Sequence, residues 1–170
     1  EPARQVLGVV GLLALTPFTH ETITAALALS PIEARRVLGE LVNYGLLLHP
    51  TELYEVTHAL IHTYALLKLT PSMDLAVVER LAAYYTTLIN ENSDKFSCLN
   101  QLRPHVMALL RLGSERKAWT SVSELAWAID NYLDIQGYWT DRVAALEAGL
   151  TAARALQDKQ SEGACLGNLG

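Results

Sequence analysis

The sequence predicts a mainly α-helical protein that contains one small β-hairpin. Apolar residues recur with a helical period over most of the 170 residues, as expected for helices that each bury one face. The period is interrupted once, where the short apolar run 46–48, a turn at 49–52 and the alternating segment 53–56 follow one another. Hydrophobic residues make up 51% of the chain and charged residues 18%, which excludes an intrinsically disordered protein.

The elements of the first part of the chain follow a recognisable order. We expect helices at 2–14, 20–29, 31–44 and 57–69, with the hairpin 46–56 before the last of them. The third helix has the clearest ends, because Ser30 and Glu33 form a capping box around Pro31, and Gly45 suits the left-handed position after the helix. This order predicts a winged-helix domain at 1–69.

The last helix of that domain is the least defined by its pattern. Its apolar side, which we expect to face the core, carries Leu60, Ile61, Tyr64 and Leu67.

Residues 70–170 carry no strand signal and predict a stacked array of helical hairpins. We expect helices at 74–90, 99–112, 115–135, 138–156 and 162–170. Pro104 is expected to start or kink its helix, Gly113-Ser114 to break the chain, and Gly137 to separate the next two helices.

Charge and hydropathy argue against nucleic acid and membrane as partners. The net charge is −5, with five basic and eight acidic residues in 1–85 and eight basic and ten acidic residues in 86–170. The helix 31–44 offers only Arg35 and Arg36 as cations, and the hairpin 46–56 has none, whereas phosphate contacts supply most of the affinity of DNA-binding proteins. No apolar run reaches the roughly 18 residues that span a bilayer.

The two cysteines, Cys98 and Cys165, lie far apart and form no disulfide framework, so we expect a reducing, cytoplasmic setting.

Catalytic and metal-binding motifs are missing from the sequence. It contains no GxxxxGK[ST], GxGxxG, GxSxG or HExxH. The GxxG pairs Gly8/Gly11 and Gly167/Gly170 follow no strand, and we expect them to allow close helix packing instead. We therefore predict a non-enzyme without a metal or other cofactor of its own.

Two polar pairs have the spacing of functional sites. His58 and His62 have the i, i+4 spacing of metal ligands, but the sequence offers no third ligand. Asp130 and Asp134 lie one helical turn apart and suit either a solvated helix end or the acidic pair of a small helical enzyme.

The densest group of aromatic residues in the chain comprises Trp119, Trp127, Tyr132, Tyr138 and Trp139. These side chains are expected either to pack between neighbouring helices or to form a ligand platform on a concave repeat surface. For the second case we select Trp119, Trp127, Tyr138 and Trp139 as the interaction surface.

Several stretches resemble bacterial STAND NTPases of the NB-ARC type. Segments 36–47 (RVLGELVNYGLL) and 54–65 (YEVTHALIHTYA) resemble their winged-helix domain. Segments 133–142 (LDIQGYWTDR), 146–150 (LEAGL) and 162–170 (EGACLGNLG) resemble the helical linker and tetratricopeptide repeats that follow it. The pair Leu169-Gly170 is similar to one inside the first helix of such a repeat, so we expect an internal piece of a longer protein.

The resemblance implies a function that residue patterns alone do not. It implies that the parent protein binds ATP or ADP in an NTPase domain, that the winged helix packs on this domain, and that the repeats sense a protein or peptide effector. In the family, a Met-His-Asp-like motif contacts the nucleotide phosphate. His58 stands at its histidine, whereas Thr57 and Ala59 replace the usual Met and Asp, so His58 serves either as a phosphate sensor or as a helix cap. The alternative function is a winged-helix DNA-binding transcription regulator with a helical sensing domain.

Overall fold

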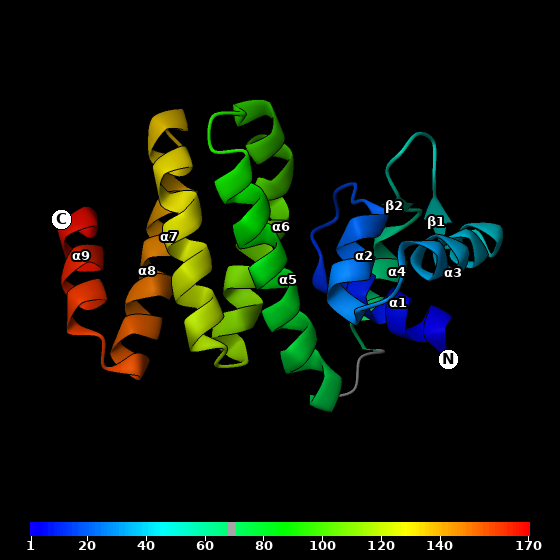
Figure 1. Ribbon diagram of the computed structural model, residues 1–170, viewed down its shortest axis with the longest axis horizontal. Coiled ribbons are helices and arrows are strands. Elements are labelled where there is room, and N and C mark those ends of the chain that lie inside the picture. The colour runs from blue at the N-terminus through cyan, green and yellow to red at the C-terminus, as the bar shows by residue number, and fades with distance from the viewer. Residues whose placement is uncertain (68–70) are drawn as a thin grey trace. The chain divides into compact units, whose positions relative to one another are not determined.

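The computed structural model describes residues 1–67 and 71–170, with the side chains of the second stretch described from residue 75 onward. Within these residues it contains nine helices and one two-stranded hairpin, which confirms the mainly α-helical prediction. The chain divides into two compact units, Glu1–Leu81 and Ala82–Gly170. The predicted domain boundary between 69 and 70 lies outside the described residues. Figure 1 shows the elements of each unit.

The first unit is a small helical core with a hairpin at its edge. Its elements are α1 (Pro2–Leu12), α2 (His20–Leu27), α3 (Pro31–Asn43), β1 (Leu47–Leu48), β2 (Glu55–Val56), α4 (Ala59–Leu66) and the first half of α5 (Pro71–Glu91). The predicted capping box is present, since the Ser30 hydroxyl accepts a bond from the Glu33 N–H and the Glu33 carboxylate accepts one from the Ser30 N–H. Gly45 follows α3 with a φ of +68°, as expected.

The hairpin is antiparallel and is extended by one residue that the sequence pattern did not indicate. Leu47 lies opposite Val56, and Leu48 lies opposite Glu55. Phe18, which precedes α2, forms an isolated antiparallel bridge with Tyr54. Their backbone groups exchange two hydrogen bonds of 3.0 and 2.8 Å. The loop between α1 and α2 is thereby fixed to the hairpin.

The core of the first unit lies between α1, α3 and α4. Its fully buried side chains come mainly from these helices and include Val6, Val9, Val10, Ile23, Ala34, Leu38 and Ala65. Gly11 lies so close to α4 that a Cβ there would be 2.3 Å from the Leu66 backbone nitrogen. The expected role of Gly11 in close helix packing is therefore confirmed. For Gly167 the same expectation is wrong, because no neighbouring atom lies within 4 Å of its Cβ position.

The predicted buried face of α4 is wrong in large part. Leu60, Tyr64 and Leu67 are exposed by 72%, 53% and 76%, whereas Ala65 is fully buried and Ile61 is half-buried. The physical reason is that α4 is apolar all round, so its sequence gives no preferred face. The short side chain of Ala65, not the larger ones, lets the helix approach α1.

The second unit is a series of long antiparallel helices. After the second half of α5 come α6 (Phe96–Glu115), α7 (Trp119–Gln136), α8 (Trp139–Leu156) and α9 (Lys159–Leu169). From α6 onward, each helix packs on the next one, and α6 also contacts α8 (Figure 1). No strand occurs among its described residues, in agreement with the sequence.

The expected interruptions around α6 are not found. The helix runs through Pro104 and through Gly113-Ser114, and it ends only at Glu115. A proline inside a helix removes one N–H donor, and α6 tolerates this loss because flanking side chains such as Val106 and Leu109 are buried. The left-handed residue after this helix is Lys117, with a φ of +60°. Gly137 separates α7 from α8, as predicted, and the structure places it in the left-handed conformation.

Candidate functional site

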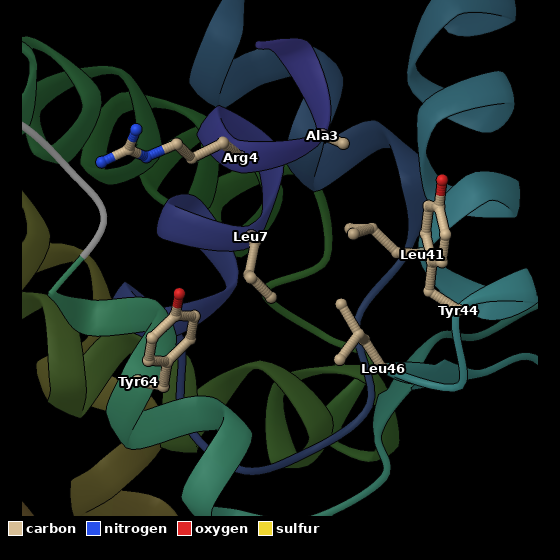
Figure 2. Close-up of a pocket in the computed structure, with 7 residues that line it drawn as sticks. All are labelled: Ala3, Arg4, Leu7, Leu41, Tyr44, Leu46 and Tyr64. Carbon is tan, nitrogen blue, oxygen red and sulfur yellow. The ribbon is translucent and has the colours of Figure 1, made fainter.

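An open groove on the first unit is lined by side chains from α1, α3, α4 and the segment before β1. Its volume is about 460 Å³, and its lining residues are Ala3, Arg4, Leu7, Leu41, Tyr44, Leu46 and Tyr64. Figure 2 shows three leucine side chains converging on the centre, with Tyr44 and Tyr64 on opposite sides. Because Gly45 reverses the chain just after α3, Tyr44 and Leu46 both reach this groove. We call it the α1/α3/α4 groove.

Arg4 is the single charged residue that lines this groove among the described residues. Its side chain is exposed, and no acidic group of the described residues lies within ion-pair distance of it. Arg36 of α3 differs in this respect, since it is paired with Glu40 one turn along the helix. The interior of the groove is therefore apolar, and Figure 2 shows the Arg4 side chain extending away from the three leucines.

Beside the groove lies the outward surface of α4. It consists of Leu60, Tyr64 and Leu67, which have the i, i+4, i+7 spacing of one helix face and are all more than half exposed. We call these three residues the α4 face. Apolar residues gathered on one surface are typical of interaction sites, whereas single exposed ones are not informative. The sequence pattern identified these residues but assigned them to the core.

His58 begins α4 as its N-cap residue. Its Nδ1 accepts a hydrogen bond from the Leu60 N–H at 3.1 Å, and its side chain is exposed. Because Nδ1 accepts, Nε2 is the ring nitrogen that carries the proton in the neutral imidazole. His58 therefore caps the helix and directs its free donor away from the cap.

His62 has a different partner, although it lies on the same helix one turn later. Its Nε2 is 2.7 Å from the Leu13 carbonyl oxygen, and it must donate because a carbonyl only accepts. This bond ties α4 to the end of α1. Within residues 1–67 and 71–170, no group of three or more His, Cys, Asp or Glu side chains is arranged to hold a metal ion.

Asp130 and Asp134 of the second unit are bridged by Arg142 of α8. The Arg142 Nε donates to Asp130 Oδ1 at 2.8 Å, and its Nη1 donates to Asp134 Oδ1 at 2.6 Å. The hydrogen bond to Asp130 raises the pKa of Arg142, with the charges of both carboxylates adding to the rise. Both carboxylates are thus paired with one guanidinium, an arrangement that joins α7 to α8 rather than leaving an acidic pair free for catalysis.

Two aromatic residues of the second unit, Tyr132 and Tyr138, belong to a polar network that links α6, α7 and the start of α8. The hydroxyls of Tyr132 and Tyr138 both donate to Asn100 Oδ1, at 3.1 and 2.9 Å. The Arg103 guanidinium lies 4.0 Å above the Tyr138 ring and pairs with Asp141. Burial raises the pKa of Tyr132 to about 12, and the neighbouring Tyr138 adds to the rise. Sequence reasoning missed Asn100 and Arg103, because their partners lie 32 to 38 residues away.

The three tryptophans do not share one place. Trp119 begins α7 and Trp139 begins α8, so they lie at opposite ends of an antiparallel pair, separated by about 25 Å at the helical rise. Trp127 lies between them along α7. Trp139 is 61% exposed, whereas Trp119 and Trp127 are half-buried. Of the predicted aromatic group, the structure brings Tyr132 and Tyr138 into contact, with ring centroids 5.9 Å apart.

A second groove lies between α6 and α8, with a volume of about 450 Å³. Its lining residues are Met107, Leu110, Arg111, Ser114, Ala144, Glu147, Ala148 and Thr151. Arg111 is already paired with Glu115 of its own helix. Since this groove mixes both charge signs with few large apolar side chains, it indicates no particular ligand.

Comparison of the chain with protein-family models, with curated proteins and with solved structures gives no match. Among the described residues, no helix combines the length and the hydropathy that a membrane span requires.

Proposed function

We propose that this chain is the non-catalytic regulatory and protein-interaction segment of a nucleotide-switched signalling protein of the STAND class. The first unit is then a winged helix that packs on a P-loop NTPase domain of the same cytoplasmic protein. The second unit is a tetratricopeptide-like array that receives a protein or peptide effector. ATP or ADP belongs to the NTPase domain in this scheme, and the chain itself carries no cofactor.

The α4 face is the observation that carries this proposal. Leu60 and Leu67 are exposed by 72% and 76%, and no described residue covers them. Fully burying one exposed apolar side chain contributes about 1.5–3 kcal/mol. Leu60, Tyr64 and Leu67 are already partly buried, so a neighbouring domain that covers all three gains about 3–6 kcal/mol before the costs of association. That gain is sufficient to hold two domains of one chain together.

His58 gives the same surface a connection to nucleotide. It precedes Leu60 by two residues, and its Nδ1 is occupied by the helix cap. Its Nε2–H is therefore the group available to a phosphate oxygen of a nucleotide bound in the covering domain. The helix N-terminus beside it adds a favourable dipole for that anion. Ala59, where the family has Asp, leaves this contact without the usual acidic neighbour.

We propose that the second unit influences how the domains of the parent protein are arranged. An effector that binds its surface, at the predicted residues Trp119, Trp127, Tyr138 and Trp139, favours one arrangement of the domains over another. Such a ligand shifts the population only by its difference in affinity for the two arrangements. The exposed Trp139 is the residue of this group best suited to contact a partner directly.

The test is made with the P-loop domain that the proposal places ahead of this segment in the parent protein. The two are produced together, and the complex is isolated through a tag on the NTPase domain. We expect the unaltered chain to co-purify and the double variant Leu60→Glu/Leu67→Glu to be lost. The matched control is Ile32→Glu, which adds a charge at an apolar residue of α3 that is 81% exposed and lies outside the α4 face.

Two outcomes contradict the proposal. One is a parent gene that encodes no P-loop NTPase domain ahead of this segment. The other is a complex that the double variant and the Ile32→Glu control retain equally well, because the α4 face then has no part in it.

A further inference from the structure

The cap at the start of α4 is a histidine rather than one of the usual capping residues. Ser, Thr, Asp and Asn are preferred at this position, whereas α4 has His58, in extended backbone with a φ of −154° and a ψ of 141°. The His58 Nδ1 accepts the N–H of Leu60 at 3.1 Å, one of the first N–H groups of the helix, which lack partners inside it. This bond requires a neutral ring, because a protonated imidazole is a donor at both nitrogens.

The other histidines of the first unit make contacts that protonation preserves. In each of them a ring nitrogen lies 2.7–3.1 Å from an acceptor oxygen: the Leu13 carbonyl for His62, the Leu53 carbonyl for His49 and the Glu21 carboxylate for His20. A ring nitrogen that faces an acceptor carries a proton, and it keeps this proton when the imidazole becomes charged. Among the described residues of this unit, His58 is therefore the single histidine whose bond needs an unprotonated nitrogen.

Packing does little to hold the first turn of α4. Ala59 and Leu60 are exposed, whereas Ala65, which is fully buried, lies near the other end of the helix. The bond from His62 to the end of α1 holds the middle of the helix and not its start. Since a helix of eight residues is marginal without tertiary contacts, the first turn depends chiefly on its cap.

The charge of a protonated ring adds a second penalty at this position. The N-terminus of a helix carries a partial positive charge, which repels a cation, and α4 has no acidic residue in its first turn to offset it. The titratable or charged groups of α4, and of α1 and β2 packed against it, are His62, Tyr64, Arg4 and Glu55. In the part of the chain that the structure describes, none of them bonds to the His58 ring.

We propose that His58 makes the first turn of α4 a pH-sensitive switch. The turn is closed while the imidazole is neutral, and it opens when the ring takes up a proton, because the cap then loses its acceptor and gains a repelled charge. Histidine is the side chain that ordinarily changes charge between pH 5 and 8. Leu60, the first residue of the α4 face, lies in this turn, so protonation loosens one end of that face. The inference goes beyond the proposed function and does not depend on it, since the cap exists in the free chain.

Hydrogen exchange of the free chain, followed by NMR at pH 8 and pH 5, tests the switch. Rates of amides 60–62 are expressed as protection factors, which refer each rate to that of an unfolded peptide at the same pH. We expect these factors to be about fivefold lower at pH 5, the effect of losing a typical N-cap. The ¹³Cε1 shift of the His58 ring reports its protonation in the same samples. Amides 37–42 of α3 are expected to keep their protection factors.

Two variants assign the response to His58. Asparagine caps helices well and does not titrate, so His58→Asn should give the same protection at both pH values. His62→Gln removes the other histidine of α4 and retains a donor for the Leu13 carbonyl, so it should keep the response of about fivefold.

The proposal is overturned if the unaltered chain keeps its protection while the His58 ring is protonated, or if the ring stays neutral at pH 5. It is also overturned if His58→Asn retains the pH response or if His62→Gln loses it. None of these results bears on whether an NTPase domain covers the α4 face, which is tested by Leu60→Glu/Leu67→Glu.

Discussion

In the first unit Gly11 brings α1 against α4, and in the second unit Gly149 brings α8 against α7 and α9, but different atoms face the two glycines. A Cβ at Gly11 would be 2.3 Å from the Leu66 backbone nitrogen and 2.6 Å from the Ala65 carbonyl carbon. A Cβ at Gly149 would be 3.3 Å from the Ala126 Cβ and 3.4 Å from the Cys165 Sγ. The backbone atoms facing Gly11 lie so close that whole helices must shift, whereas the contacts at Gly149 need only a few tenths of an ångström of adjustment. The first unit therefore requires glycine, and the second only prefers a small residue.

The two units also differ in how polar groups link their helices. In the second unit, Asn100 and Arg142 each join residues of separate helices through several hydrogen bonds. In the first unit, His62 makes one such bond to the Leu13 carbonyl, and large apolar residues remain exposed beside it. Side-chain networks thus link helices of the second unit, whereas single side-chain bonds link those of the first, from His62 and from Arg80 to the Ala26 carbonyl.

The largest effect is expected for Gly11→Ala. The added methyl meets backbone on two residues of α4, so α1 and α4 must separate. Overpacking of this kind costs about 1–3 kcal/mol or more. We expect Gly11→Ala to lower the free energy of unfolding of the first unit by about 3 kcal/mol. Urea denaturation followed by circular dichroism measures it.

Two matched substitutions sharpen this result. Gly39→Ala lies in the interior of α3 with open space around it, so the better helix propensity should stabilise by about 0.5–1 kcal/mol. Gly149→Ala should change stability by less than about 1 kcal/mol, since propensity offsets the tighter contact. If Gly11→Ala is no worse than Gly149→Ala, the contrast between the two units is wrong.

The next largest loss of stability is expected on replacement of Arg142. In Arg142→Met, Asp130 remains 13% exposed beside Asp134 without its cation. Leaving a buried charge without its partner costs about 1–3 kcal/mol. The comparison is Arg154→Met, whose pair with Glu162 involves an arginine that is 57% exposed, so solvent screens the pair and its loss should change stability much less. Equal thermal stability of the two variants contradicts a structural role for the Arg142 bridge.

A pH effect is expected from Tyr132, whose pKa is raised to about 12 by burial. A phenol with a raised pKa in the folded state stabilises fully below its unfolded value, which is roughly 10, and loses this contribution as the pH rises through about 12. The Tyr132→Phe variant should therefore lose stability less steeply between these pH values. Ultraviolet absorbance near 295 nm follows phenolate formation, and a Tyr132 that ionises together with exposed tyrosines contradicts the prediction.

The smallest effect is expected for Ala28→Gly. Ala28 ends α2 in the left-handed conformation, with a φ of +53°, which costs a residue with a Cβ about 1–2 kcal/mol. Glycine removes this cost but adds unfolded-state entropy, so we expect a net gain of about 0.5 kcal/mol. Thermal unfolding measures it, with Ala164→Gly in the exposed interior of α9 as a destabilising control.

The sequence predicted the elements whose signals are local. The capping box of Ser30, the left-handed Gly45 and Gly137, and the hairpin each follow from a few neighbouring residues, and each is present. Pro104 was the exception, since a local rule predicted a helix start or a kink there, and α6 instead begins at Phe96 and continues past it. Packing along α6 outweighs the loss of one hydrogen bond.

Features that depend on contacts between residues far apart in the sequence could not be predicted from local patterns. The orientation of α4 depends on which small residue fits against α1, and Ala65 gives no signal in an apolar helix. The Phe18–Tyr54 bridge and the Asn100 network join residues that are 32 or more positions apart. The aromatic group was predicted as one cluster, but helix length separates Trp119 from Trp139.

Hydrogen exchange of α4 tests the central proposal most directly. Exchange of the amides 59–67 is measured by mass spectrometry in the free chain and in its complex with the ADP-bound NTPase domain. We predict at least about tenfold slower exchange of α4 amides in the complex, since a covered helix opens less often, while amides around Ile32 keep their rates. Unchanged exchange in α4 within a stable complex would contradict the proposal that this face packs on the NTPase domain.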